Sequence, residues 1–183
     1  MNREEALKLV KENIKNKNLV KHCLAVEACM RGLASHFKED EEIWGLSGLL
    51  HDIDYEETKE DAHQHSVVGA QMLKDLGLPQ NIVDAVRTHN EMHGEAPETK
   101  MAKSLFCVDP LTGLMVASTL VLPSKKISEV TVENVLNRFK ERAFARGATR
   151  EVIAKCSDIN LNLEEFVKIS LKAMQEISGD IGL

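Results

Sequence analysis

The chain has 183 residues, of which 43% are apolar and 28% charged, and its formal net charge is −6 at pH 7. This length and composition are typical of one folded globular domain, and they exclude disordered and fibrous chains. The acidic balance argues against a polyanion-binding surface, so we expect no nucleic acid polymer as a partner. A small anionic substrate remains open, because a bound metal can supply positive charge locally.

No part of the sequence indicates export or a membrane span. The first eighteen residues, MNREEALKLVKENIKNKN, lack the apolar core of a signal peptide. The longest apolar run, GLMVASTLVL, is shorter than the roughly 20 residues needed to cross a bilayer. The cysteines form no CxxC pair and lie in apolar helical patterns, as reduced core residues do; they are Cys23, Cys29, Cys107 and Cys156. We therefore expect a cytoplasmic chain with no membrane partner.

Apolar residues recur at helical spacing along the whole chain, and no segment alternates with the period of a strand. Asn162 and Glu165 have capping-box spacing at the start of the last predicted helix. The pattern predicts an all-α fold with helices over 2–15, 18–38, 40–54, 64–76, 79–92, 100–122, 131–146, 149–157 and 163–178. We expect a single domain over 1–183, with a helical-bundle core over about 18–122 and additional C-terminal helices over about 124–183.

Histidines and carboxylates interrupt the apolar faces of the first predicted helices. In NLVKHCLAVEACM, His22 shares its face with apolar residues on both sides. In SGLLHDIDYEE, His51 and Asp52 flank the apolar stripe and Asp54 lies close to it. The small residues of this stretch, such as Gly48, allow a neighbouring helix to approach closely.

The same feature recurs further along. His65 heads the apolar stripe of HSVVGAQML, His89 continues the stripe of IVDAVRTH, and Asp109 aligns with apolar positions of its predicted helix. Each residue also has a simpler reading. A lone inward histidine is commonly a hydrogen-bonded core residue, and Asp109 before Pro110 also fits a helix N-cap followed by proline.

Taken together, these residues favour a metal site. Buried imidazoles and carboxylates cost several kcal/mol each unless they are paired or bind a metal. The basic side chains nearby in the sequence are only two, Arg87 and Lys103. The mixture of imidazole and carboxylate suits a divalent transition metal, Mn, Fe, Co, Ni or Zn, and the absence of cysteine argues against a structural zinc knot.

The order H…HD…H…H…D on helical faces, with HDID followed by HSVVGAQML, resembles the HD-domain superfamily of metal-dependent phosphohydrolases and its HDIG-type branch. The resemblance covers about residues 18–122. It implies one metal bound by His22, His51, Asp52 and Asp109. In members with two metals, it implies a second ion held by His65 and His89 and bridged by Asp52, whose two oxygens can join two cations.

Three positions depart from the pattern. Asp54 stands where the HDIG motif has glycine, and Asn90 stands where some relatives have a second histidine. Pro110 follows the last predicted ligand directly and is expected to kink that helix.

We predict hydrolysis of a phosphoester in a small molecule, with nucleotides among the candidates, by water that one or two metal ions activate. Asp54 is the candidate general acid or base, and Arg87 and Lys103 are candidates to clamp the phosphate, although all three also fit ordinary surface residues. Two alternatives remain: an HD-fold di-iron oxygenase, and a non-catalytic metal-containing module that senses a ligand. A homodimer is compatible with each of them.

Overall fold

The computed structural model describes all residues from 1 to 183, and its regular structure is entirely helical, as the sequence predicted. The α-helices are joined by short turns and three 3-10 helices, labelled η. In chain order the elements are α1 (Arg3–Asn13), α2 (Lys17–Phe37), α3 (Glu41–Leu50), α4 (Tyr55–Thr58), α5 (Val67–Asp75), α6 (Gln80–Thr88), η1 (Glu91–His93), α7 (Lys100–Leu120), η2 (Ile127–Glu129), α8 (Val132–Lys140), α9 (Arg150–Ala154), η3 (Lys155–Ile159), α10 (Leu163–Glu176) and α11 (Ser178–Ile181).

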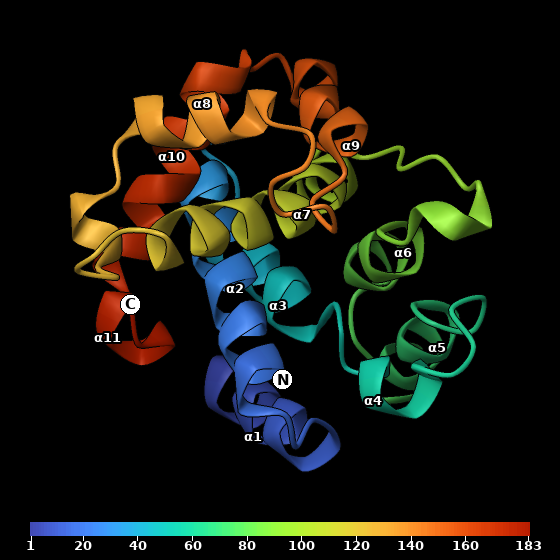
Figure 1. Cartoon of the computed structure of the whole chain (residues 1–183). Helices are drawn as coiled ribbons and strands as arrows, with labels where there is room; N and C mark the ends of the chain where they lie inside the picture. The colour runs from blue at the N-terminus through green and yellow to red at the C-terminus, as the bar shows by residue number, and fades with distance from the viewer.

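Helix α7 crosses the middle of the molecule and contacts both the N-terminal and the C-terminal helices (Figure 1). On one side it packs against α2, α3 and α6, with α5 beyond α6. On the other side it packs against α8, α9 and η3. Helix α10 also reaches back to α2, so the C-terminal helices close over the bundle. The carboxylate-bearing middle of α7 therefore lies where the two groups of helices meet.

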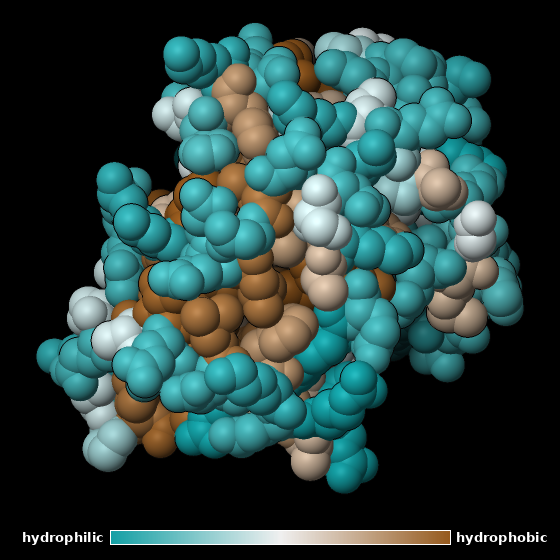
Figure 2. Space-filling model, turned by 90° about the horizontal axis from the view of Figure 1, so that it is seen from above, coloured by the Kyte–Doolittle hydropathy of each residue, from teal (hydrophilic) through white to brown (hydrophobic).

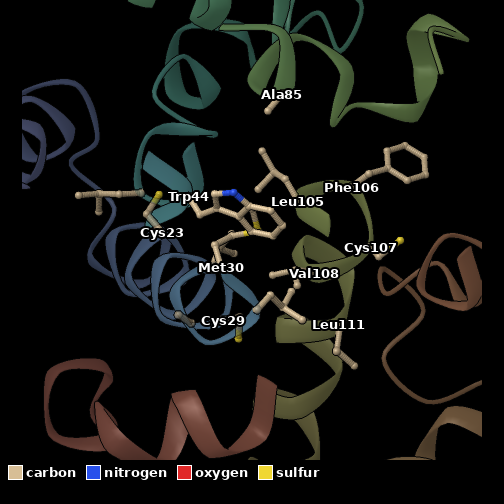
Figure 3. Close-up of a cluster of buried hydrophobic side chains, with 14 of the residues drawn as sticks. Cys23, Cys29, Met30, Trp44, Ala85, Leu105, Phe106, Cys107, Val108 and Leu111 are labelled. Carbon is tan, nitrogen blue, oxygen red and sulfur yellow. The ribbon is translucent and has the colours of Figure 1, made fainter. Parts of the chain in front are cut away.

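One apolar core joins these elements. It contains 45 buried residues that range from Ala6 in α1 to Ile181 in α11. Met30, Trp44 and Leu105 meet between α2, α3 and α7, whereas Phe106 projects to another side of α7 (Figure 3). Full burial of each such side chain stabilises the fold by about 1.5–3 kcal/mol. All four cysteines are buried and free, which confirms the prediction of reduced core thiols.

A close approach of α2 and α3 depends on Gly48. A Cβ atom at this position would lie 2.9 Å from the carbonyl oxygen of Val26 and 3.0 Å from the Cα of Glu27. Only glycine fits against the backbone of α2 without a shift. The contact confirms the expectation from the small residues of this stretch, and it brings His22 on α2 close to the end of α3.

Several predicted helices end earlier in the structure than the apolar pattern suggested. Helix α3 ends at Leu50 rather than at 54, and α5 begins at Val67 rather than at 64, because residues between them form turns around the side chain of Asp54. Helix α8 ends at Lys140 rather than at 146. The short helices α4 and α11 were not predicted. Apolar spacing cannot detect such turns, because long-range polar contacts stabilise them.

Pro110 does not start a helix. Helix α7 runs without interruption from Lys100 to Leu120, and Thr99 caps its N-terminus by accepting a hydrogen bond from the backbone N–H of Ala102. The interpretation of Asp109 as an N-cap was therefore wrong. At the last long helix Asn162 is confirmed as the N-cap, because its side chain accepts from the backbone N–H of Glu165. The Glu165 carboxylate accepts from the side-chain amide of Asn162 rather than from its backbone N–H, so the reciprocal half of the capping box is not formed.

No helix combines the length and the apolarity that a membrane crossing requires. Viewed from above, the surface is mostly hydrophilic, with a band of hydrophobic side chains exposed between hydrophilic ones (Figure 2).

Candidate metal centre

The six predicted metal ligands converge from five segments of the chain. His22 lies in α2, His51 and Asp52 directly follow α3, and His65 lies in the turn before α5. His89 is the C-cap residue of α6, and Asp109 lies in the middle of α7. Four of the six, His51, Asp52, His65 and His89, occupy helix ends or turns, where the backbone stops being regular.

Asp52 occupies the centre of the cluster. One carboxylate oxygen, Oδ1, lies 3.4 Å from Nε2 of His51, 3.3 Å from Nε2 of His65 and 3.6 Å from Nε2 of His89. The other oxygen, Oδ2, lies 3.6 Å from Nε2 of His22. The side chain is buried, so these contacts replace its hydration. Asp52 thus faces imidazoles on both of its oxygens.

A second group of atoms gathers around Asp109. Its Oδ1 lies 3.0 Å from Nε2 of His22 and 3.8 Å from Nε2 of His51. The two Nε2 atoms lie 3.2 Å from each other. Ligand atoms of His22, His51 and Asp109 form one set with metal-like spacing, and those of His51, Asp52 and His89 form another.

The second ring nitrogen of each histidine fixes where its proton lies. Nδ1 of His51 is 2.8 Å from the carbonyl oxygen of Gly48, and Nδ1 of His89 is 2.6 Å from that of Val86. Carbonyl oxygens only accept, so both Nδ1 atoms carry a hydrogen. In a neutral ring, Nε2 then offers only a lone pair. For His89 this Nε2 is buried without any hydrogen-bond partner.

His22 follows the same pattern through Thr112. The Thr112 hydroxyl donates to the backbone carbonyl of Asp109 at 2.8 Å, which leaves its lone pair to accept from Nδ1 of His22 at 3.2 Å. The lone pairs of His22 and His51 consequently face each other and the carboxylate of Asp109. Acceptors that face acceptors repel one another unless a cation lies between them. The donor set therefore fits a divalent transition metal.

The electrostatic field of the cluster also favours positive charge. Burial lowers the pKa of His51, but the carboxylates of Asp52 and Asp109 outweigh burial and raise this pKa to about 9. Burial likewise lowers the pKa of His65, whereas Asp52 and Asp54 raise it to about 10. Burial raises the pKa of Asp52 and Asp109, yet the imidazoles around them hold both values well below the usual range.

Asp54 lies behind His65 rather than among the ligand atoms. Its Oδ1 accepts a hydrogen bond from Nδ1 of His65 at 2.9 Å, and its Oδ2 accepts from the backbone N–H groups of Ser66 and Gly69 at 2.8 Å each. The side chain is fully buried. A Cβ atom on Gly69 would lie 3.1 Å from the Asp54 carboxyl carbon, so glycine makes room for this arrangement. The aspartate that departs from the HDIG pattern thus orients His65.

Two further polar residues hold the turn around His65: Asn90, which the sequence marked only as a departure from the family pattern, and His93, which it did not single out. Asn90 donates from its amide to the carbonyls of Ala62 and His65, at 3.0 and 3.2 Å. His93 donates from Nε2 to the carbonyl of His65 at 2.7 Å. Ser66 adopts a positive φ of 71°, which is unfavourable for a residue with a side chain. Backbone strain of this kind persists where surrounding contacts over-determine it, as they do here.

Neither predicted phosphate clamp reaches the ligand atoms. The guanidinium of Arg87 forms two hydrogen bonds with the Glu95 carboxylate, at 2.9 and 2.7 Å, and lies at the surface. Lys103 lines a separate hollow of about 500 Å³, which shares Glu91 and Phe106 with the hollow at the histidines.

Two hollows adjoin the cluster. One, of about 200 Å³, is lined by His65, His89 and Asp109 on one side and by Gly147, Thr149 and Val152 of the C-terminal region on the other. The Thr149 hydroxyl donates to the Glu91 carboxylate at 3.2 Å and joins the two walls. The other hollow, of about 570 Å³, lies beside His22. The C-terminal helices thus contribute a wall of the site, which the sequence did not reveal.

Arg150 holds this C-terminal wall in place. Its guanidinium is buried and donates to six backbone carbonyls, those of Arg138, Phe139, Glu141, Phe144, Ala145 and Ala148. Two of these bonds supply hydrogen-bond donors to the carbonyl groups of Arg138 and Phe139 at the C-terminal end of α8. The others hold the loop that follows, in which Ala145 has a positive φ of 45°. The loop leads directly to Gly147 and Thr149 at the cleft.

A helical bundle that gathers four imidazoles and two carboxylates in this order defines a metal-binding domain of the HD type. The sequence model described as HD domain matches residues 19–115, and the chain belongs to the HD-domain family. This confirms the resemblance at the level of the superfamily, whose members are generally metal-dependent hydrolases. Membership of the HDIG branch stays a prediction.

Curated relatives agree with this assignment. The protein MJ0778 of Methanocaldococcus jannaschii, described as uncharacterized, is 30% identical over 149 residues, which cover 76% of this chain and 85% of that protein. Ribonuclease Y of Lawsonia intracellularis is 29% identical over 138 residues, 74% of this chain. Ribonuclease Y of Sulfurovum sp. is 26% identical over 168 residues, 90% of this chain. The chain spans only 26% and 32% of the length of these two ribonucleases.

Proposed function

We propose that this chain is a metal-dependent phosphohydrolase that acts on a phosphoester of a small molecule. The observation that carries the proposal is the convergence of acceptor atoms: in their neutral forms His22 and His51 turn their Nε2 lone pairs toward each other and toward Asp109, and the buried Nε2 of His89 has no hydrogen-bond partner. Such facing acceptors need positive charge between them, which protons supply in the metal-free chain and which a bound cation supplies when it displaces those protons. Membership of the HD-domain family supports the same chemistry.

We assign the ligands to two sites. His22, His51 and Asp109 hold one ion together with Asp52, because their ligand atoms lie within reach of a single cation. His65 and His89 hold a second ion, again with Asp52, whose Oδ1 lies 3.3 and 3.6 Å from their Nε2 atoms. When bound, such cations supply Lewis acids that activate water and neutralise the charge of the phosphoryl oxygens.

The protein residues orient this donor set. Carbonyl oxygens fix the rings of His51 and His89 through Nδ1, and Thr112 and Asp54 do the same for His22 and His65. Hydrogen bonds of this type hold a metal-binding imidazole in the required tautomer and orientation. We therefore propose Asp54 as a positioning residue, in place of the general acid or base that the sequence suggested.

The surroundings favour a small substrate. The hollows beside the cluster measure about 200 and 570 Å³, and the C-terminal wall narrows the smaller one. The relatives named ribonuclease Y raise RNA as another substrate, but the net charge of −6 disfavours binding of a polyanion. Lys103, in the neighbouring hollow, remains a proposed contact for a distal charged group, whereas the Glu95 pair makes Arg87 a weaker candidate.

Phosphate release by the purified chain tests the proposal. The chain is stripped with a chelator, reloaded singly with Mn, Co, Ni, Zn or Fe, and incubated with phosphomonoesters, nucleotides, cyclic dinucleotides and a short RNA. We expect metal-dependent phosphate release from a small ester, and at least about 100-fold less from the Asp52→Asn variant. If RNA alone were hydrolysed, the substrate would be RNA and not a phosphoester of a small molecule. Consumption of dioxygen by the iron form, without phosphate release, would favour the di-iron oxygenase.

A further inference from the structure

Tyr55, the only tyrosine of the chain, stands at the edge of the metal centre. Its ring centroid lies 5.3 Å from that of His65, and the planes meet at 82°, an edge-to-face contact. The residue is nonetheless 45% exposed. An aromatic ring beside the cluster therefore keeps an uncovered surface.

This uncovered ring lines the larger of the two hollows beside the cluster. The hollow measures about 570 Å³, and its lining comprises two amides, one carboxylate, one ammonium, one imidazole and two apolar or aromatic side chains: Asn16, Asn18, Glu56, Lys59, His22, Leu19 and Tyr55. Small-molecule sites generally enclose about 300–1,000 Å³. The hollow at His89 and Gly147, about 200 Å³, is below this range. An organic group attached to a phosphate at the cluster thus finds its space on the Tyr55 side.

The walls of the Tyr55 hollow are linked to one another. The Glu56 carboxylate accepts from the backbone N–H groups of Lys15 and Asn16, at 2.8 and 2.6 Å. These bonds lower the pKa of Glu56 and tie α4 to the turn between α1 and α2. Tyr55 and Asn16 both line this hollow, and the Glu56 hydrogen bonds hold their two segments of backbone next to each other.

The chemistry of the walls suits one class of ligand. A tyrosine ring offers a stacking surface, and the amides of Asn16 and Asn18 both donate and accept hydrogen bonds. Lys59 adds a positive charge, whereas the Glu56 carboxylate in the same wall is already bound by the backbone N–H groups of Lys15 and Asn16. Planar heteroaromatic rings use all of these features at once, since each has a π face and a polar edge.

We propose that this hollow binds the organic part of the substrate and stacks its aromatic ring on Tyr55. The substrate class is then a phosphomonoester that carries an aromatic ring, with nucleobases as the natural example. The inference rests on the proposed function, because it places the phosphate at the histidine cluster.

Non-hydrolysable phosphonates test this inference without any turnover. Benzylphosphonate and propylphosphonate carry the same charged group, and only the first carries a ring. Their affinities for the Mn-loaded chain are measured by calorimetry for the wild type, Tyr55→Leu and Tyr55→Phe. Leucine keeps an apolar side chain but removes the ring, whereas phenylalanine keeps the ring. Since Tyr55 is 45% exposed and lies outside the buried core, both variants should fold, and circular dichroism verifies this.

We expect the wild type to bind benzylphosphonate about 10-fold more tightly than propylphosphonate. Tyr55→Leu should remove this preference, and Tyr55→Phe should retain it within about 2-fold. Equal weakening of both ligands in Tyr55→Leu would show that Tyr55 acts only by supporting His65, and it would overturn the inference. A wild type without preference, or without phosphonate binding, would overturn it as well. Absence of phosphate release in the hydrolysis panel would instead count against the proposed function. The role of Tyr55 in binding an aromatic ring is tested by the phosphonate affinities alone, which require no turnover.

Discussion

The Asp54 carboxylate holds the ring of His65, with 2.9 Å between Oδ1 of Asp54 and Nδ1 of His65. Asp54→Asn keeps the size of the side chain but weakens this hydrogen bond. We expect affinity for the second cation to fall about 10- to 100-fold, as for other residues that orient a metal ligand. Metal titration followed by calorimetry measures the loss.

The exposed Asp61, which accepts from the backbone N–H of His63, supplies the matched control. Asp61→Asn should leave both metal affinities unchanged. Retained metal affinity in Asp54→Asn, together with loss of one limb of the pH–rate profile, would instead identify Asp54 as the general acid or base.

Asp52 is the residue shared by both proposed ion sites. Asp52→Asn removes the anionic charge that faces four imidazoles. We expect bound metal to drop at both sites and kcat/KM to fall at least about 100-fold. Elemental analysis of wild type and variant, purified side by side, measures the first effect. Full metal content in the variant would contradict the proposal that Asp52 would serve both ion sites.

Gly48 sets the distance between α2 and α3, and so between His22 and His51. In Gly48→Ala the new Cβ must push against the backbone of Val26 and Glu27. We expect a loss of about 1–3 kcal/mol in the free energy of unfolding and weaker metal binding at the first site. Denaturant unfolding with and without metal measures both.

Gly113 offers the control for this substitution. It lies in α7, and nothing is within 4 Å of a Cβ added there. Gly113→Ala should stabilise the chain by about 0.5–1 kcal/mol, because alanine favours the helix. If both alanine variants behaved alike, close helix packing at Gly48 would not be the cause.

Metal affinity should rise with pH. The raised pKa values, about 9 for His51 and about 10 for His65, mean that protons compete with a cation for these imidazoles at neutral pH. Binding therefore releases protons, and affinity increases until about pH 9–10. Calorimetry at pH 7 in two buffers of different ionisation enthalpy counts the released protons. A buffer-independent binding enthalpy would contradict this prediction.

The stability of the chelated chain should show the opposite trend. Both folded-state pKa values lie above the reference value of 6.5. The stabilisation from these two imidazolium groups is thus fully present below about pH 6.5 and is lost as the pH rises through about 9–10. Thermal unfolding in the presence of a chelator, measured from pH 6 to 10, should give a falling Tm.

Arg150 supports the C-terminal wall of the site. Arg150→Met removes all six hydrogen bonds to backbone carbonyls and retains an apolar stem of similar length. We expect a destabilisation of about 2–4 kcal/mol, since one buried and five partly buried hydrogen bonds to carbonyls are lost. Amide hydrogen exchange should increase in residues 141–149 more than in α2. Uniform exchange over both segments would contradict a local role.

The sequence determined the helical fold and the identity of the clustered residues. Apolar spacing revealed the helices, and the inward positions of His22, His65 and His89 were visible because one helix face must be apolar to be buried. The order of histidines and aspartates then indicated that they belong together, since each is costly to bury alone.

Only the tertiary structure decided what each polar residue contacts. In the sequence, Asp54 and Arg87 were candidates for catalytic roles. In the folded chain Asp54 accepts a hydrogen bond from His65, and Arg87 forms an ion pair with Glu95. The wall around Gly147 and the ring of Tyr55 were invisible, because their positions follow from contacts between segments far apart in the chain. Helical periodicity reports which face is buried, and it carries no information on which distant segment covers that face.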